Sequence, residues 1–307
     1  MITRPLKAPG VPITDKQLEQ LQYPLVSSPK LDGIRALCTG TEVLSSSLKR
    51  LGNQYIQECL GYTDYAGLDG ELVVGSPTAC DEFGMSTVFN TTTGAVRRAD
   101  GKPNFLFYIF DDFSHPSMSY EGRWLKCKDD IDMPHVVVLE QRICHCPQDV
   151  IDYDIECVNL GYEGTMPRRI SAPYKQGRAT FKEEIIFKRK SVLDDEAIII
   201  GFEEANENCN KKTTSELGTS KRSGHKENLV PKGTLGAFIL KSDKWKEPFN
   251  CGTGLGLTEK IRQEIWNNQD DWLGKMVTYK YQGYGSLLKP RQPIFKGERL
   301  VIDKTTY

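Results

Sequence analysis

The feature that most constrains the fold is the irregular order of strand and helix signals in roughly the first 190 residues. Short runs of aliphatic and aromatic residues, bounded by Gly, Pro or charged residues, predict strands at Ala36–Cys38, Gly70–Val74, Phe105–Phe110 and Val136–Leu139. Two helices are predicted, Tyr120–Asp130 and Cys146–Leu160. A parallel doubly wound sheet needs regular strand–helix alternation, so this pattern favours an α+β domain.

The C-terminal part has a different pattern. Strands are predicted at Ala197–Phe202, Leu235–Lys241, Lys275–Tyr281 and Arg299–Ile302, with one helix at Thr258–Asn267. About five short strands and one helix suit a small β-barrel of the OB type. We therefore predict two domains, residues 1–192 and 193–307. The Asn/Thr/Ser/Gly-rich middle of Asn206–Lys246, with its surplus of Lys and Arg, predicts a long loop.

The overall charge balance excludes a uniformly basic nucleic-acid binder. The formal net charge is −1, and 38% of residues are hydrophobic and 26% charged, as in ordinary globular proteins. Any surface for nucleic acid must therefore come from local segregation of charge.

The nine cysteines show no disulfide-like spacing, which favours reduced thiols in a cytoplasmic compartment, the host cytoplasm if the chain is viral. Cys144-His145-Cys146 is a poor zinc site because its ligands are adjacent and no second CxxC half is present. The N-terminal stretch is broken by prolines, and no segment approaches the length of a membrane span. We expect a protein that does not bind membranes.

The sharpest local motif runs from Pro29 to Arg35 and contains Lys30, Asp32 and Gly33. Lysine attacks as a neutral amine, so a nucleophilic lysine needs burial or neighbouring cations. Arg35 supplies a cation that can also hold a phosphate, and Asp32 supplies a carboxylate for a metal. In isolation, a surface turn with a solvated ion pair explains the motif equally well.

Five further sequence segments follow this motif along the chain. They are, in order, Leu68-Asp69-Gly70-Glu71, Phe107-Tyr108-Ile109-Phe110-Asp111, Tyr162-Glu163-Gly164-Thr165, Ile186-Phe187-Lys188-Arg189-Lys190 and Pro293-Ile294-Phe295-Lys296-Gly297-Glu298-Arg299. Together these segments resemble the motif series of the covalent nucleotidyltransferases, and most closely the compact ATP-dependent DNA ligases of bacteriophages. The resemblance implies a nucleotidyltransferase domain with ATP-grasp-like antiparallel sheets, followed by an OB-fold domain.

The resemblance implies a three-step reaction. Lys30 attacks the α-phosphate of ATP to form lysyl-AMP, the AMP passes to the 5′-phosphate at a nick in duplex DNA, and the 3′-hydroxyl then displaces AMP. Such transfers need positioning and charge neutralisation more than acid–base chemistry. A monomer that uses Mg²⁺, or Mn²⁺ in its place, is expected. The resemblance does not separate a role in replication from one in repair or recombination.

The resemblance also implies roles for individual residues. Lys30 is the catalytic residue, Phe110 stacks on the adenine, and Lys188 and Lys190, alternating on a strand, grip the α-phosphate. Asp32, Glu71 and Glu163 are the predicted magnesium ligands, since Mg²⁺ prefers carboxylate oxygens beside phosphates. The predicted ATP- and AMP-binding residues are Ser28, Lys30, Leu31, Arg35, Glu71, Phe110, Lys188, Lys190, Lys296 and Arg299, the last two orienting pyrophosphate. For Phe110 and the Lys188/Lys190 pair, the structural alternatives are a core aromatic and a solvated basic edge.

Two positions depart from the family. Ser28 stands where many relatives carry a glutamate that recognises adenine, so the predicted preference for ATP over GTP is less secure. Ser46 stands where an arginine is usual, so Lys49 or Arg50 is predicted to hold the DNA instead. The basic segment Lys211–Lys232 is a candidate DNA clamp, with Arg222 and Lys226 near its tip; a flexible solvated loop is the alternative.

Two rival interpretations remain at this point. An RNA ligase or a GTP-dependent capping guanylyltransferase would use the same motifs. A non-catalytic OB-containing DNA-binding protein would retain the fold without the chemistry. Labelling of the protein with ATP or GTP, followed by a choice of nicked DNA or nicked RNA, separates a DNA ligase from an RNA ligase or a guanylyltransferase. A Lys30→Ala variant separates an enzyme, which would lose label transfer, from a binding protein, which would lose nothing.

Overall fold

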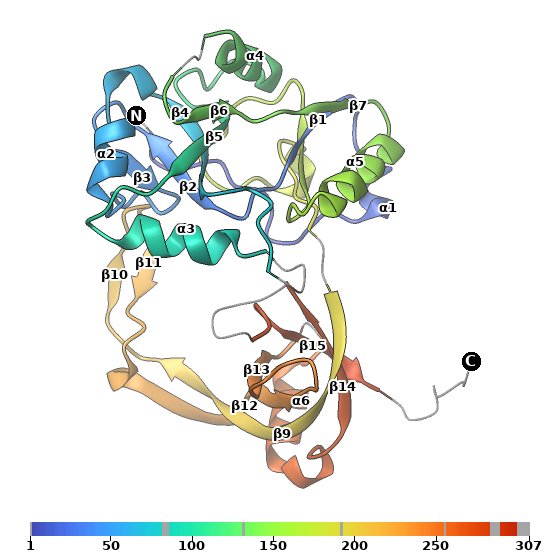
Figure 1. Ribbon diagram of the computed structural model, residues 1–307. Helices are drawn as coiled ribbons and strands as arrows, with labels where there is room; N and C mark the ends of the chain where they lie inside the picture. The colour runs from blue at the N-terminus through green and yellow to red at the C-terminus, as the bar shows by residue number, and fades with distance from the viewer. Residues whose placement is uncertain are drawn as a thin grey trace. The chain divides into compact units, whose positions relative to one another are not determined.

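The computed structural model describes residues 2–81, 86–130, 133–190, 193–254, 256–282 and 289–299. The chain forms two compact units, Met1–Ser191 and Val192–Tyr307. Each has its own sheets (Figure 1).

The first unit contains two sheets. Its strands are β1 (Leu25–Pro29), β2 (Ile34–Cys38), β3 (Val43–Ser45), β4 (Leu68–Val74), β5 (Phe105–Asp112), β6 (Val136–Val138), β7 (Arg142–Cys144) and β8 (Thr165–Arg169). One sheet has the order β3-β2-β4-β5-β6 and the other β7-β1-β8, with the β5–β6 pair parallel and the rest antiparallel. The predicted α+β class is confirmed, and the four predicted strands are β2, β4, β5 and β6. The sequence patterns missed β1, β3, β7 and β8.

Helices cover these sheets. They are α1 (Asp15–Leu18), α2 (Gln54–Leu60), α3 (Val88–Arg97), α4 (Tyr120–Asp130) and α5 (Pro147–Asn159), with 3₁₀ turns η1 (Thr63–Tyr65) and η2 (Phe181–Glu183). Helix α5 packs on β1 and β7 (Figure 1). It begins at Pro147, a position where the missing N–H costs no helical hydrogen bond. The predictions for α4 and α5 are confirmed.

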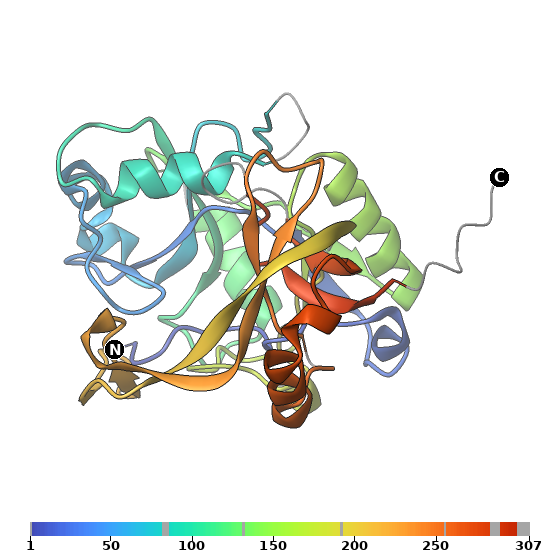
Figure 2. The same ribbon diagram turned by 90° about the horizontal axis from the view of Figure 1, so that it is seen from below.

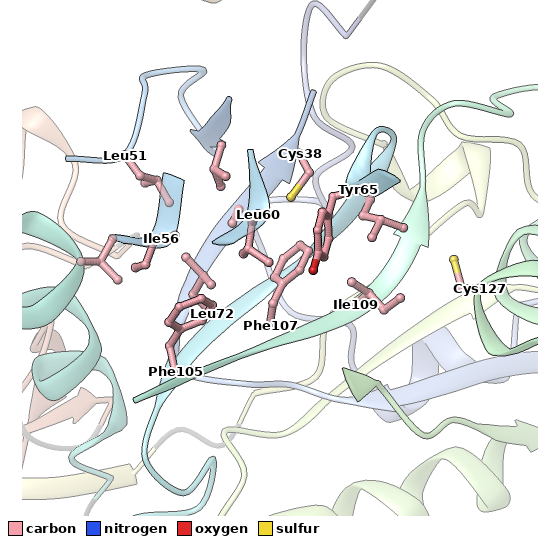
Figure 3. Close-up of a cluster of buried hydrophobic side chains, with 14 residues drawn as sticks. Cys38, Leu51, Ile56, Leu60, Tyr65, Leu72, Phe105, Phe107, Ile109 and Cys127 are labelled. Carbon is pink, nitrogen blue, oxygen red and sulfur yellow. The ribbon is translucent and has the colours of Figure 1, made fainter. Parts of the chain in front are cut away.

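The core of the first unit packs against one face of the larger sheet. Phe105, Phe107 and Ile109 alternate along β5 and pack with Leu72 and Leu60 on one side (Figure 3). Fully burying side chains of this size stabilises the fold by about 1.5–3 kcal/mol each. Successive side chains of a strand point to opposite faces of the sheet, so Glu71 of β4 and Phe110 of β5 lie on the face opposite this core.

The second unit contains a ring of five paired strands, in the order β12-β13-β15-β14-β9 and back to β12. The strands are β9 (Leu193–Asn208), β10 (Lys212–Thr214), β11 (Ser220–Arg222), β12 (Leu229–Lys241), β13 (Phe249–Gly252), β14 (Met276–Tyr281) and β15 (Ile294–Glu298). Helix α6 (Glu259–Asn267) and the 3₁₀ turns η3 (Lys226–Asn228) and η4 (Gln269–Asp271) complete it. The predicted OB-like fold and α6, capped by Thr258, are confirmed. Strand β15 ends at Glu298 and Arg299 is in no strand; the rest of the strand predicted at Arg299–Ile302 lies outside the described residues.

The predicted long loop is wrong. Strands β9 and β12 continue together beyond the rest of the ring, and β10 and β11 form an antiparallel hairpin at their end (Figures 1 and 2). All six residues of β10 and β11 are exposed. A hairpin with no buried face shows no apolar alternation, and for this reason the sequence pattern missed it.

The base of this hairpin is held by polar contacts. Asn210 is 6% exposed, and its side-chain amide donates to the carbonyls of Ser223 and His225. The guanidinium of Arg222 donates to the carbonyls of Asn208 and Asn210. Arg222 pairs with Lys212 and therefore lies at the base of the hairpin, so its predicted position near the tip is wrong.

No helix within the described residues is both long enough and apolar enough to cross a membrane.

Candidate active site in the N-terminal unit

A cavity of about 130 Å³ lies in the first unit, bordered by both sheets. Six of the residues predicted to bind the nucleotide line it: Ser28, Lys30, Leu31, Arg35, Glu71 and Phe110. Leu139, Met166, Arg168 and Ile186 also line it, and the sequence motifs predicted no role for these four. The cavity therefore joins motif segments that are far apart in sequence.

Lys30 directly follows β1 and is fixed by its backbone. Its N–H donates to the carbonyl of Gly164 at 2.8 Å, and its carbonyl accepts from the N–H of Glu163 at 3.1 Å. Gly164 has φ +140°, and a Cβ there would lie 2.4 Å from the carbonyl oxygen of Arg189. Glycine thus allows the chain around residue 189 to approach Glu163 and Lys30 closely.

Glu163 is shared by two lysines. One carboxylate oxygen pairs with the amine of Lys30 and the other with the amine of Lys190. The Glu163 side chain is 12% exposed. Burial alone would raise its pKa, but the charges of Lys30 and Lys190 and their hydrogen bonds outweigh burial and lower the pKa. The nucleophile candidate therefore has a carboxylate as its direct neighbour.

Arg35 is committed to a buried network. Its Nε donates to Asp69 Oδ1 at 2.8 Å, a second guanidinium nitrogen pairs with Asp69 Oδ2, and a third donates to the carbonyl of Leu6. The hydroxyl of Tyr174 also donates to Asp69 Oδ2, at 2.7 Å. Arg35 is therefore neutralised by Asp69, which differs from the expectation of a free cation beside Lys30. Its predicted contact with a phosphate stays a prediction.

Glu71 sits on β4 at the wall of the same cavity. Burial raises its pKa, and although Lys30 and Arg35 oppose this shift, the net effect raises the pKa to about 8. A cation placed beside Glu71 would offset this effect of burial.

Phe110 lies at the cavity wall, and it is flanked by two arginines. The guanidinium carbons of Arg35 and Arg168 lie 5.5 Å and 5.0 Å from its ring centre. Arg168 also donates to Asp111 Oδ2 at 2.7 Å, and Asp111 binds the buried Arg123 as well. This arrangement fixes the position of the Phe110 ring. Whether it stacks on a base stays a prediction.

The segment with Lys188 and Lys190 is extended, but the predicted regular strand is absent. It makes isolated backbone pairs with β8: Phe187 N donates to Pro167 O at 2.7 Å, and Arg189 N donates to Thr165 O at 2.8 Å. Burial lowers the pKa of Lys188, and the nearby charges of Lys30, Lys190 and Arg178 lower it further. Lys188 is thus a cation in a predominantly cationic environment, which an anion would relieve.

A second, larger hollow of about 570 Å³ shares Arg35 and Glu71 with the cavity. Ser46, Lys49 and Arg50 line it, as do Phe89, Thr93 and Arg97 of the α3 region. Arg50 is largely exposed, with Glu42 3.9 Å away. Arg97 and Phe89 were not predicted, because no motif marks them.

The remaining predicted residues lie elsewhere. Lys296 and Arg299 form ion pairs with Asp194 and Glu196 of β9 in the second unit. Lys226 begins the exposed turn η3 beside the hairpin. Asp32 is half-buried and is not among the residues that line the cavity.

The three predicted metal ligands do not form a ready-made metal centre. Within the described residues, no group of three or more His, Cys, Asp or Glu side chains is gathered closely enough to hold an ion. Mg²⁺ beside phosphates commonly takes one or two protein carboxylates and completes its shell with water and substrate oxygens. Glu71 and Glu163 fit that use of carboxylates.

Comparison with known proteins gives a consistent result. The family model of the DNA ligase OB-like domain matches residues 229–299. A DNA ligase of Haemophilus influenzae is 25% identical over 271 residues, which are 87% of this chain and 83% of that protein. The structure of Chlorella virus DNA ligase-adenylate is 27% identical, with a TM-score of 0.52 over 98% of this chain and 99% of that chain. A Lig E DNA ligase is 21% identical, with a TM-score of 0.65 over 90% and 92%, which supports the fold.

The fold, the lysine-containing cavity and these likenesses define a polynucleotide ligase, an enzyme that forms phosphodiester bonds. More particularly, residues 229–299 match the DNA ligase OB-like domain, and the chain is similar in sequence and fold to DNA ligases. The predicted resemblance to DNA ligases is confirmed.

Proposed function

We propose that the chain seals nicks between a 3′-hydroxyl and a 5′-phosphate in duplex DNA through a covalent adenylate on Lys30. The observation that carries this proposal is the position of Lys30 at the cavity wall, paired with Glu163 and next to Lys190. The Haemophilus influenzae relative is named a DNA ligase, and the Chlorella virus structure is named a ligase-adenylate.

In the proposed first step, the Lys30 ammonium releases a proton to solvent, and its neutral Nζ forms a bond to the α-phosphorus of ATP while the bond to pyrophosphate breaks and the pyrophosphate leaves with the electron pair. Lys188 and Lys190 balance the charge on the phosphate oxygens, and Glu163 holds Lys30 in place until the phosphate arrives. Leu139, Met166 and Phe110 supply apolar walls for the base. Lys296 and Arg299 are proposed to leave their acidic partners and orient the pyrophosphate.

Magnesium is proposed as the metal, held by Glu71 and Glu163, with Asp32 as a further candidate ligand. When bound, Mg²⁺ supplies positive charge that stabilises the leaving pyrophosphate. Glu71 gives up its proton more readily beside such a cation, because the cation offsets the burial that raises its pKa.

Two surfaces are proposed to bind the DNA. Lys49 and Arg50 lie at the larger hollow next to the cavity, and Arg97 adds a third cation there. The hairpin β10–β11 is the proposed clamp, with exposed Lys212, Lys221 and Lys226 facing phosphates. Arg222 supports the clamp from its base, since its guanidinium is bound to two carbonyls.

The decisive experiment incubates the purified protein, freed of nucleotide, with Mg²⁺ and α-labelled ATP or GTP. We expect label from ATP to be bound covalently to the wild type. Lys30→Ala and Lys30→Arg should reduce labelling more than about 1000-fold, since the nucleophile is lost. Labelled protein is then offered nicked DNA or nicked RNA. Label from GTP, or sealing of RNA alone, would favour the rival substrates, and an unlabelled wild type would overturn the proposal.

A further inference from the structure

The segment that carries Lys188 and Lys190 is held by a second set of charges on the opposite side of the chain from Glu163. Arg189 lies between the two lysines, and its side chain is 13% exposed. Its Nη1 pairs with Asp15 Oδ1 of α1 at 2.8 Å, and its Nε lies 3.1 Å from Asp154 Oδ2 of α5. Two helices thus grip one residue of this segment.

Asp154 also holds the strand across from Arg189. Its other carboxylate oxygen accepts from the hydroxyl of the fully buried Thr165, at 2.7 Å. Thr165 and Arg189 are themselves a backbone pair, with N···O distances of 2.8 Å and 3.3 Å. One carboxylate therefore binds the side chains of both members of the pair. Asp154, 14% exposed, has little access to water that could replace these partners.

The backbone pair is directly connected to the reacting groups. Two residues before Thr165 is Glu163, and one residue after Arg189 is Lys190, whose amine Glu163 binds. Neighbouring residues in extended chain point to opposite sides, so Arg189 faces away from the side that Lys188 and Lys190 face. The carbonyl of Lys188 is bound as well, by the N–H of Ile13 at 2.9 Å.

We propose that Asp154 is a positioning residue for adenylate transfer, acting through Arg189 and Thr165 to fix Lys188 and Lys190 against Glu163 and Lys30. This inference rests on the proposed function. Phosphoryl transfer depends on placement of the phosphate-binding groups, and a displacement of about 1 Å costs on the order of 100-fold in rate. The apolar walls for the base lie outside this network.

The test compares Asp154→Asn with a matched control on the same helix. Glu156→Gln breaks an ion pair with Arg142 in which both side chains are about half exposed, 48% and 45%. Self-adenylation is followed in single-turnover reactions over a range of ATP concentrations. We expect Asp154→Asn to lower the rate constant at saturating ATP by about 30- to 100-fold, while the ATP concentration for half-maximal rate changes less than about threefold. Glu156→Gln should match the wild type in both values.

A pair of substitutions at Arg189 keeps the proposal testable if Asp154→Asn fails to fold. Arg189→Met removes the cation and should give the same loss of rate as Asp154→Asn. Arg189→Lys retains a cation that can reach one carboxylate and should recover at least about a fifth of the wild-type rate. A thermal melt of each variant shows whether the fold is intact.

The outcomes are distinct. If the wild type is labelled while Asp154→Asn and Arg189→Met behave like Glu156→Gln, the inference is wrong and the proposed function stands. If the variants lose rate and ATP affinity together in proportion to a lowered melting temperature, Asp154 is merely structural and the inference is again wrong. If the wild type takes no label, the proposed function fails and the inference fails with it.

Discussion

The basic residues of the cavity and those of the hairpin differ in what surrounds them. At the cavity, Lys30 shares the buried Glu163 with Lys190, and Arg35 is bound by Asp69. On the hairpin, Lys212 and Lys221 lie on fully exposed strands, and no ion pair to either is seen in the described part of the chain. The cations at the cavity are held in place by carboxylates, whereas the lysines of the hairpin are exposed to solvent.

This difference matches two kinds of phosphate binding. A reacting phosphate has to be placed to a fraction of an ångström, so its cations are best held by buried partners. A DNA backbone offers many equivalent phosphates, so exposed cations on a firm support suffice, and their contribution is screened by salt. The hairpin supplies the support through Asn210 and Arg222 rather than through its lysines.

The largest effect is expected from removing the carboxylate that Lys30 and Lys190 share. Glu163→Gln leaves Lys30 and Lys190 as buried cations without their shared anion, so they repel each other and lose their alignment. We expect the rate constant for self-adenylation to fall by at least about 100-fold. Quench-flow labelling with ATP measures it, with Glu156→Gln as control. A loss smaller than about fivefold would show that Glu163 is not needed to hold the amine.

A smaller effect is expected at the hairpin. The double variant Lys212→Met/Lys221→Met should weaken binding of nicked duplex by about tenfold and reduce the slope of log affinity against log salt by about 1.8, because two phosphate contacts are lost. Self-adenylation should stay at the wild-type rate. Lys260→Met on α6, whose amine lies 3.9 Å from Glu264, is the control. An unchanged salt slope would remove the hairpin from the DNA interface.

A third test uses the pH dependence of stability. Glu71 has a pKa raised to about 8 in the folded protein, above its ordinary value of 4.5, so the folded state binds this proton more tightly than the unfolded state. Ionisation of Glu71 therefore lowers the free energy of unfolding as the pH rises from 4.5 to about 8. Glu71→Gln should melt a few degrees higher than the wild type at pH 8, with the difference shrinking toward pH 5. A difference that grows toward pH 5 would contradict the assigned cause.

The smallest effect is expected at Ser28. Its side chain is 2% exposed and lines the cavity, but it is short and uncharged. Ser28→Ala should change the half-saturating ATP concentration less than about threefold, because base recognition then depends on main-chain groups and on Phe110. A change in the ATP-to-GTP preference of more than tenfold in labelling competition would identify Ser28 as the base-reading residue.

Local signals in the sequence predicted much of the fold. The periodicity of α4 and α5, the cap at Thr258 and the apolar runs of β4 and β5 depend on near neighbours, so their positions were found. The hairpin was missed because its strands bury nothing. The strand predicted at Arg299–Ile302 lies, apart from Arg299, outside the described residues, and β15 was missed because only its first two residues, Ile294 and Phe295, are apolar.

The candidate site was predicted in its members but not in its pairings. The ordered motifs brought Lys30, Glu71 and Phe110 to the cavity. No sequence signal indicates that Arg35 binds Asp69 together with Tyr174, a residue 105 positions beyond that aspartate. Such contacts depend on how segments distant in sequence pack together, which a single sequence does not specify. The role of Asp154 was missed for the same reason.

Gly164 shows how a residue with no side chain can set the dimensions of a reaction centre. The space left by its missing methyl group lets two stretches of backbone nearly touch, and the carboxylate before it meets an amine from the far stretch. Any side chain at residue 164 would push the two backbone segments apart and separate Glu163 from Lys190. Substitutions are therefore poorly tolerated at this position, even if it makes no contact with the nucleotide.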